Sequence, residues 1–185
     1  MKSVLISIHP KWCDLIASGK KTIEVRKTAP KEVPFKAYIY ETYDKKYVDI
    51  GICWEKGKCF EHGCKKVIGE FVCDCITDIK PFGFDDIVEF EKQTCLTSAD
   101  IVKYLNGFYG YGWHISDLKI YDKPKELSDF YVHKYDRRDY CDGCVHHECP
   151  VTEYPCCECC ADERNRAYLY RPPQSWCYVE ELQNV

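Results

Sequence analysis

The sequence predicts an α+β fold, namely a small, mixed and partly open β-barrel with two or three flanking helices and a cysteine-rich extension. Three observations predict it. Several short segments alternate apolar and polar residues, as strands do. Two segments have apolar residues at helical spacing and residues typical of helix ends, and many cysteines lie within residues 141–160. We expect the barrel in residues 1–130 and the extension in 131–185, because strands of mixed order with few helices fit a barrel better than β–α–β repeats.

The expected strands differ in their patterns. Residues 67–76 have the strongest strand pattern, and residues 35–42 alternate. The glycine–aromatic run at 108–112 leads into a further strand. The expected strands are residues 1–8, 22–26, 35–42, 67–76, 113–120 and 176–179.

The two expected helices have recognisable ends. In residues 10–18 the apolar side chains fall at helical spacing, and Gly19 suits the position just past the last turn. In residues 97–106, Thr97 and Asp100 have the spacing of a capping pair before an apolar run. Residues 81–92 are expected to be helical or irregular.

The octet Gly19-Lys20-Lys21-Thr22-Ile23-Glu24-Val25-Arg26 passes from the first helix into a strand. Alternation places Glu24 and Arg26 on one face of this strand, close to Lys21. Charged side chains gathered in this way can hold an anion or position an acid beside a base. The alternative is a solvated strand face with local ion pairs.

The octet resembles the G-x-K-x-x-E-x-R signature of the ASCH domain, a branch of the PUA-like superfamily. The resemblance extends to residues 3–8, 66–77 and 113–115, and it implies a PUA-like barrel over 1–130. Members of the family are inferred to bind RNA or nucleotides. Residues 120–127 and 168–179 are also similar to ASCH proteins of phages and prophages.

The resemblance implies a basic cleft beside the octet that binds RNA or a nucleotide-like ligand. Basic side chains of the octet would meet phosphates, and an aromatic ring such as Trp12, Tyr40 or Trp113 would stack on a base. For both tryptophans the alternative is core packing, and for His114 it is an ordinary strand residue. The candidate ligand-binding residues are Lys20, Lys21, Glu24, Arg26, Trp12, Trp113 and His114.

Two other functions remain open. Some small ASCH proteins resemble amidohydrolases that deacetylate a modified cytidine, and their lysine corresponds to Lys21. Where they have a threonine this chain has Glu24, so the hydrolase alternative assigns catalysis on an acylated nucleoside to Lys21 and Glu24. The third function is a protein-interaction adaptor that binds a partner through the cysteine-rich extension.

The charge distribution favours the first of these functions near the octet. The net charge is −4, yet residues 1–36 contain eight Lys or Arg against three Asp or Glu, whereas residues 131–185 contain six against ten. The sequence has neither a basic-aromatic array of the RRM type nor a glycine-rich phosphate loop. Sequence-specific RNA readout is therefore not predicted.

The fifteen cysteines suggest a metal. The sequence has no pattern of a signal peptide or membrane span, so we expect a cytoplasmic protein whose thiols stay reduced. Residues 141–160 contain seven cysteines and two histidines. Cys-x2-Cys pairs suit the tetrahedral geometry of structural Zn²⁺. The candidate ligands are Cys141, Cys144, Cys149, Cys156 and Cys159.

The ligand set stays open at this point. Four cysteines or three cysteines and one histidine would complete a site, Cys157 and Cys160 form an overlapping pair, and two ions could share the cluster. The alternative is a thiol-rich loop without metal. A smaller group could form a second site or lend a ligand to the first; it comprises Cys53, Cys59, His62 and Cys64.

Overall fold

The structure of the protein is a computed structural model, and it describes residues 1–44, 63–80, 87–133 and 166–181. Within these ranges it is a mixed α+β fold with three α-helices, as predicted. The elements in chain order are β1 (Ser3–Ile8), α1 (Pro10–Ala17), β2 (Ile23–Arg26), β3 (Phe35–Glu41), β4 (Val67–Cys73), β5 (Ile76–Ile79), α2 (Ile87–Thr94), α3 (Ser98–Leu105), β6 (Gly110–His114), β7 (Ser116–Lys125), the 3-10 helix η1 (Leu127–Asp129), β8 (Phe130–His133), β9 (Arg166–Tyr168), β10 (Trp176–Tyr178) and β11 (Glu180–Glu181).

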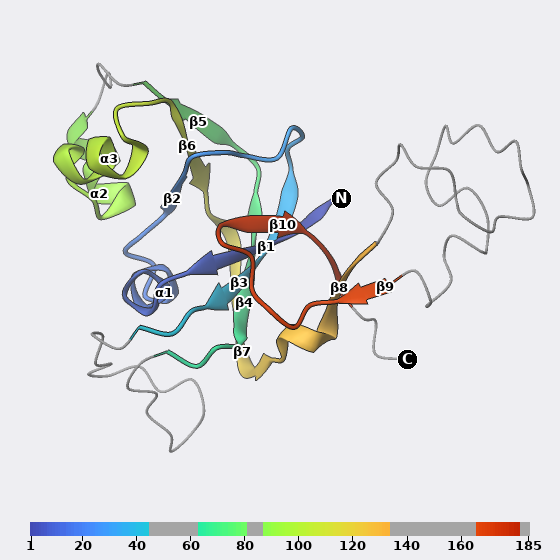
Figure 1. The fold of residues 1–185 in the computed structure, drawn as a ribbon. Helices are drawn as coiled ribbons and strands as arrows, with labels where there is room; N and C mark the ends of the chain where they lie inside the picture. The colour runs from blue at the N-terminus through green and yellow to red at the C-terminus, as the bar shows by residue number, and fades with distance from the viewer. Residues whose placement is uncertain (45–62, 81–86, 134–165, 182–185) are drawn as a thin grey trace, which may run out of the picture.

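The strands form three sheets (Figure 1). The largest has the order β10-β1-β3-β4-β7, in which β1 and β3 are parallel and the other pairs are antiparallel. The two smaller sheets have the orders β2-β6-β5 and β11-β8-β9. Among the described residues none of these orders returns to its first strand, so they form no closed barrel; the sequence predicts a partly open one.

The observed strands differ from the predicted ones at Ile115. The sequence predicts one strand over residues 113–120, but the chain changes sheets within it. β6 pairs with β2 and β5, whereas β7 pairs with β4. A segment whose two halves bond to different neighbours cannot form one uninterrupted ladder. The small and large sheets therefore meet at a corner.

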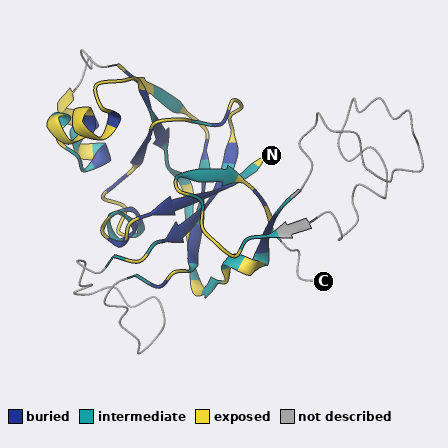
Figure 2. Cartoon of the chain, in the orientation of Figure 1, coloured by how far each residue is buried: buried dark blue, intermediate teal, exposed yellow. Residues whose placement is uncertain are grey.

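The alternation of β1 divides the core between the two faces of the large sheet. Val4, Ile6 and Ile8 pack in a cluster with α1 and Trp113, whereas Leu5 packs on the opposite face with Phe130 of the third sheet. Figure 2 shows β1 and β3 buried between their neighbours. A strand that is apolar on both faces is expected where both faces are covered.

A third apolar cluster holds α2 and α3 against the β2-β6-β5 sheet. Ile23 and Val25 of β2 pack there with Phe90, Ile101 and Leu105. Because side chains alternate along a strand, this contact turns Glu24 and Arg26 to the other face of β2. The prediction that these two sets of side chains face opposite ways is confirmed.

The predicted helix ends are confirmed. Pro10 occupies the first turn of α1, and Gly19 follows the helix with a φ of +72°, a conformation that glycine adopts without a Cβ clash. The Thr97 side chain accepts a hydrogen bond from the Asp100 N–H, and the Asp100 carboxylate accepts one from the Thr97 N–H. α3 therefore begins with a capping box.

The predicted zinc ligands at 141–160 lie outside the described residues, as do Cys53, Cys59 and His62. Cys64 is described: it is buried and its N–H donates to Glu41 Oε2 at 2.6 Å. In the described ranges no three His, Cys, Asp or Glu side chains are grouped closely enough to hold a metal ion. The helices of those ranges are all too short or too polar to span a membrane.

Substitution of Trp113 tests the packing of the central core. Its side chain is fully buried and makes edge-on ring contacts with Phe35 at 5.0 Å and Trp176 at 5.7 Å between centroids. We expect Trp113→Ala to lower the free energy of unfolding by about 3–5 kcal/mol, because it leaves a large cavity. Urea unfolding measures this. The matched control is Phe108→Ala on the exposed turn after α3, expected to change stability by about 0.5 kcal/mol or less.

Candidate functional site

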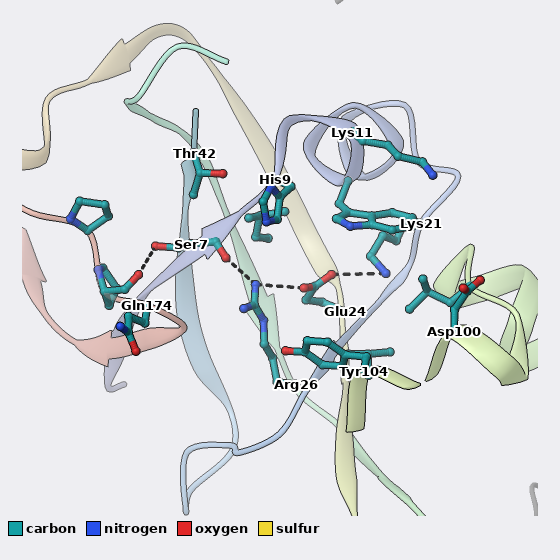
Figure 3. A pocket seen from close by; sticks show the side chains of 16 residues that line it. Ser7, His9, Lys11, Lys21, Glu24, Arg26, Thr42, Asp100, Tyr104 and Gln174 are labelled. Carbon is teal, nitrogen blue, oxygen red and sulfur yellow. Dashed lines mark hydrogen bonds and ion pairs between the residues drawn. The ribbon is translucent and has the colours of Figure 1, made fainter. Parts of the chain in front are cut away.

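A cavity of about 650 Å³ lies where β1, α1, β2 and α3 meet the segment before β10 (Figure 3). Its wall combines cationic, acidic and aromatic side chains. The lining residues are Ser7, Ile8, His9, Lys11, Trp12, Lys21, Glu24, Val25, Arg26, Thr42, Leu96, Asp100, Tyr104, Pro172, Pro173 and Gln174.

Three charged side chains form the floor of the cavity, and we call them the ion triad: Lys21, Glu24 and Arg26. Lys21 Nζ lies 3.3 Å from Glu24 Oε2, and Arg26 Nη2 lies 3.0 Å from Glu24 Oε1. The three side chains are only 1%, 8% and 8% exposed. A solvated strand face, the alternative considered for this octet, is therefore excluded.

Local structure accounts for the position of the ion triad. Beyond the end of α1, the N–H groups of Lys20 and Lys21 both donate to Leu15 O at 2.9 Å, which directs the chain into β2. β2 then pairs antiparallel with β6, with Glu24 opposite Trp113. The apolar side of β2 is held by α2 and α3, so the charged side must face the cavity.

Lys21 connects β2 to the end of α2. Its Nζ donates to Thr94 O at 2.7 Å, and it lies 5.2 Å from the centroid of the Trp12 ring. Thr94 is the last residue of α2, so the ammonium satisfies a carbonyl at the negative end of that helix. This partner is a backbone atom far along the chain, and the octet itself contains no indication of it.

Arg26 connects β2 to β1. Its Nη2 donates to Ser7 O at 2.7 Å as well as to Glu24. Within the described part of the chain its Nε has no hydrogen-bond partner, so the guanidinium retains donor capacity.

Tyr104 supplies a hydroxyl group beside the guanidinium. Burial raises the pKa of Tyr104, and the negative charge of Glu24 raises it further, while Arg26 opposes both effects. The hydroxyl is therefore protonated at neutral pH and can donate a hydrogen bond as well as accept one.

The electrostatic balance of the floor is positive. The ion triad contains two positive charges and one negative charge, and all three are removed from water. A buried net charge is costly unless an opposite charge approaches it. The cavity is therefore suited to an anionic or strongly electron-rich ligand. Lys11 and His9 lie at the same cavity and are exposed, so they add donors where a ligand would enter.

The structure brings only some of the predicted site residues together. The ion triad and Trp12 line the cavity, whereas Lys20, Trp113 and His114 do not. Lys20 is exposed and Trp113 lies in the core. His114 Nε2 forms a hydrogen bond of 2.8 Å with Thr77 Oγ1. Tyr40 is buried in the cluster on the far face of the large sheet.

Several lining residues were missed by the sequence reasoning. Lys11 and His9 lie at the start of α1. Their proximity in sequence to Trp12 is the only feature of the sequence that could have marked them as site residues. Tyr104 and Gln174 come from segments far along the chain, and their patterns resemble ordinary helix and loop. The missed lining residues with polar groups are Ser7, His9, Lys11, Thr42, Asp100, Tyr104 and Gln174.

Comparisons with known proteins agree with this fold. The family model of the ASCH domain matches residues 6–135, so the chain belongs to the ASCH domain family. A comparison with curated protein sequences gives no match.

Two solved structures resemble the chain. The crystal structure of ASCH from Zymomonas mobilis is 18% identical, with a TM-score of 0.55, over 97% of this chain and 88% of that chain. A serine-to-alanine mutant of ZmASCH from the same organism is 17% identical, with a TM-score of 0.55, over 97% and 89%. This likeness supports the fold alone. The similarity of residues 120–127 and 168–179 to phage proteins stays a prediction.

Lys21→Met tests the structural part of the ion triad. Methionine retains much of the apolar length but leaves Glu24 with one cationic partner and Thr94 O without its donor. We expect the free energy of unfolding to fall by about 1–3 kcal/mol, because the buried Thr94 O loses its donor while Glu24 stays paired with Arg26. Chemical denaturation measures this. Lys20→Met removes an exposed neighbouring charge and is expected to change stability by about 0.5 kcal/mol or less. Equal effects of the two variants would contradict the assignment.

Proposed function

We propose that this ASCH protein binds RNA or a nucleotide-like ligand in the cavity above the ion triad. The observation that carries the proposal is the buried net positive charge on the floor of a cavity large enough for a nucleotide. ASCH domains are generally RNA-binding domains of the PUA-like class, which supports the same conclusion.

The rest of the cavity wall supports this ligand class. Trp12 and Tyr104 offer aromatic surface, on which any of the bases can stack. Lys11 Nζ lies 4.6 Å from the centroid of the Trp12 ring, so a cation accompanies the stacking surface. A phosphate beside Lys11 and a base against Trp12 would use both parts of a nucleotide.

Lys11 provides a sharper test than the ion triad, because it is exposed and its removal leaves the buried charges paired. We expect Lys11→Ala to weaken binding of a labelled single-stranded RNA. The slope of log K against log salt should become less steep by about 0.7, since one contact to a single-strand phosphate is lost. Fluorescence anisotropy at several salt concentrations measures both quantities.

The matched control is Lys31→Ala. Lys31 is also exposed, and its removal changes the net charge by the same amount, but it lies in the connection before β3 and does not line the cavity. Equal losses in the two variants would indicate nonspecific attraction. Absence of RNA binding by the unaltered protein at low salt would overturn the proposed function.

The hydrolase alternative assigns catalysis to Lys21 and Glu24. Lys21 Nζ already contacts Thr94 O and Glu24, which favours a positioning role over attack on a substrate. Incubation with an acylated cytidine and chromatography of the product tests this alternative directly.

We also propose that residues 141–160 bind structural Zn²⁺, with ligands chosen from Cys141, Cys144, Cys149, Cys156 and Cys159. The proposal rests on the Cys-x2-Cys spacing, because two thiolates separated by a tight turn can approach one metal ion. Short segments between ligands would depend on the metal for folding. Such a module would be the contact surface in the adaptor alternative.

The zinc proposal predicts at least one equivalent of zinc in protein purified under reducing conditions. Titration of the thiols should release it, and Cys141→Ser combined with Cys144→Ser should lower the bound amount. Elemental analysis and a chromogenic zinc indicator measure content and release. Exposed Cys75→Ser is the control. Metal-free protein from a reducing purification would contradict the proposal.

A further inference from the structure

One wall of the cavity comes from a segment beyond the matched ASCH region. Pro172, Pro173 and Gln174, which we call the strap, line the cavity and precede β10. The family model ends at residue 135, so the strap belongs to the part of the chain that follows the family module. It therefore offers ligand contacts that the octet alone does not supply.

Ser7 holds the strap in place. Its Oγ donates to Pro173 O at 2.6 Å, and its N–H donates to Ser175 O at 2.9 Å. The strap then continues into β10, which pairs antiparallel with β1 through Ile6 and Trp176. Trp176 Nε1 further donates to Thr28 Oγ1 at 3.0 Å. The wall is thus tied to β1 through Ser7 and β10, and to the segment after β2 through Trp176.

The two prolines make the strap stiff. Each has a restricted φ and lacks an N–H donor, so few conformations compete with the observed one. A rigid wall loses little conformational entropy when a ligand binds, and it holds its side chains at defined positions.

The strap and the ion triad share Ser7 as a common support. Ser7 O accepts the hydrogen bond from Arg26, while its N–H and Oγ hold the strap. A continuous polar connection therefore extends from Pro173 through Ser7, Arg26 and Glu24 to Lys21. Figure 3 shows this row, with Gln174 near one end and Asp100 beyond the other. A ligand on the ion triad would lie next to the strap.

Gln174 has the chemistry to recognise a base. Its side chain is exposed at the cavity, and no hydrogen bond to it is found among the described residues. An amide offers an acceptor beside donors, the same pattern as the edge of a nucleobase, with which it can form two parallel hydrogen bonds. Of the exposed charged groups at the cavity wall, Lys11 is a cation and suits phosphate, whereas Asp100 is an anion and would repel it.

We propose that Gln174 is the residue that discriminates between bases in this site, and that the strap positions it. The inference rests on the proposed binding of RNA or a nucleotide. It assigns charge recognition to the floor and to Lys11, and base recognition to Gln174.

The test uses the full chain and short single-stranded homopolymers of the four bases, with affinities measured by competition against one labelled RNA. We expect the unaltered protein to prefer its best base over its worst by at least about fivefold, the lower end for a bidentate contact. Gln174→Ala should bring the four affinities within about twofold while leaving the salt slope unchanged, because phosphate contacts remain.

Gln174→Glu gives a second, directional readout. A carboxylate only accepts hydrogen bonds, so the preference should move toward guanine, which presents two adjacent N–H donors. Loss of packing alone would not change the order of the four ligands in this way. The matched control is Gln93→Ala. The Gln93 amide contacts Glu89 on α2 away from the cavity, so this variant should keep the original order of affinities for the four homopolymers.

Two results would overturn the inference while leaving the proposed function intact: equal affinity of the unaltered protein for all four homopolymers, or an unchanged preference in both Gln174 variants. Absence of binding to any homopolymer at low salt would overturn the proposed function and the inference together. Reduced discrimination in Gln174→Ala with a changed order in Gln174→Glu supports the inference.

Discussion

The buried attraction among Lys21, Glu24 and Arg26 is the constraint on which the candidate site depends. Each charge has lost its water, so each requires an opposite charge or a hydrogen-bond partner at close range. Glu24 serves both cations, Lys21 also holds the end of α2 through Thr94 O, and Arg26 also holds β1 through Ser7 O. Three separate parts of the fold are thereby fixed around one cavity before a ligand arrives.

This arrangement divides the work between the floor and the rim of the cavity. Much of the hydrogen-bonding capacity of the floor is used within the protein, which gives it structural precision and a fixed positive field. Lys11 and Gln174 are exposed at the edge of the cavity, and we call this edge the rim. Substitutions of such rim residues are expected to leave the buried charges undisturbed, because exposed side chains carry little of the folding energy.

The two faces of β2 require different side chains, which accounts for the alternation of apolar and charged residues in the octet. One side of the strand packs against α2 and α3 through Ile23 and Val25, while the other presents Glu24 and Arg26 to the cavity. A shift of one residue in its pairing with β6 would place charges against the helices and apolar side chains in the cavity. The apolar contacts and the buried ion pairs therefore stabilise the same register of β2.

The sequence by itself determined the features that depend on local periodicity: α1 and its glycine end, the capping box of α3, and the alternation that gathers Glu24 and Arg26. It also contained the octet that led to the ASCH family. Only the tertiary structure decided that the predicted strand over 113–120 changes sheets at Ile115, that Trp113 is core, and that Gln174 reaches the cavity. The partners of Lys21 and Arg26 are the carbonyl groups of Thr94 and Ser7. Every residue has a carbonyl, so no side-chain pattern identifies such a partner, and long-range packing alone brings it into contact.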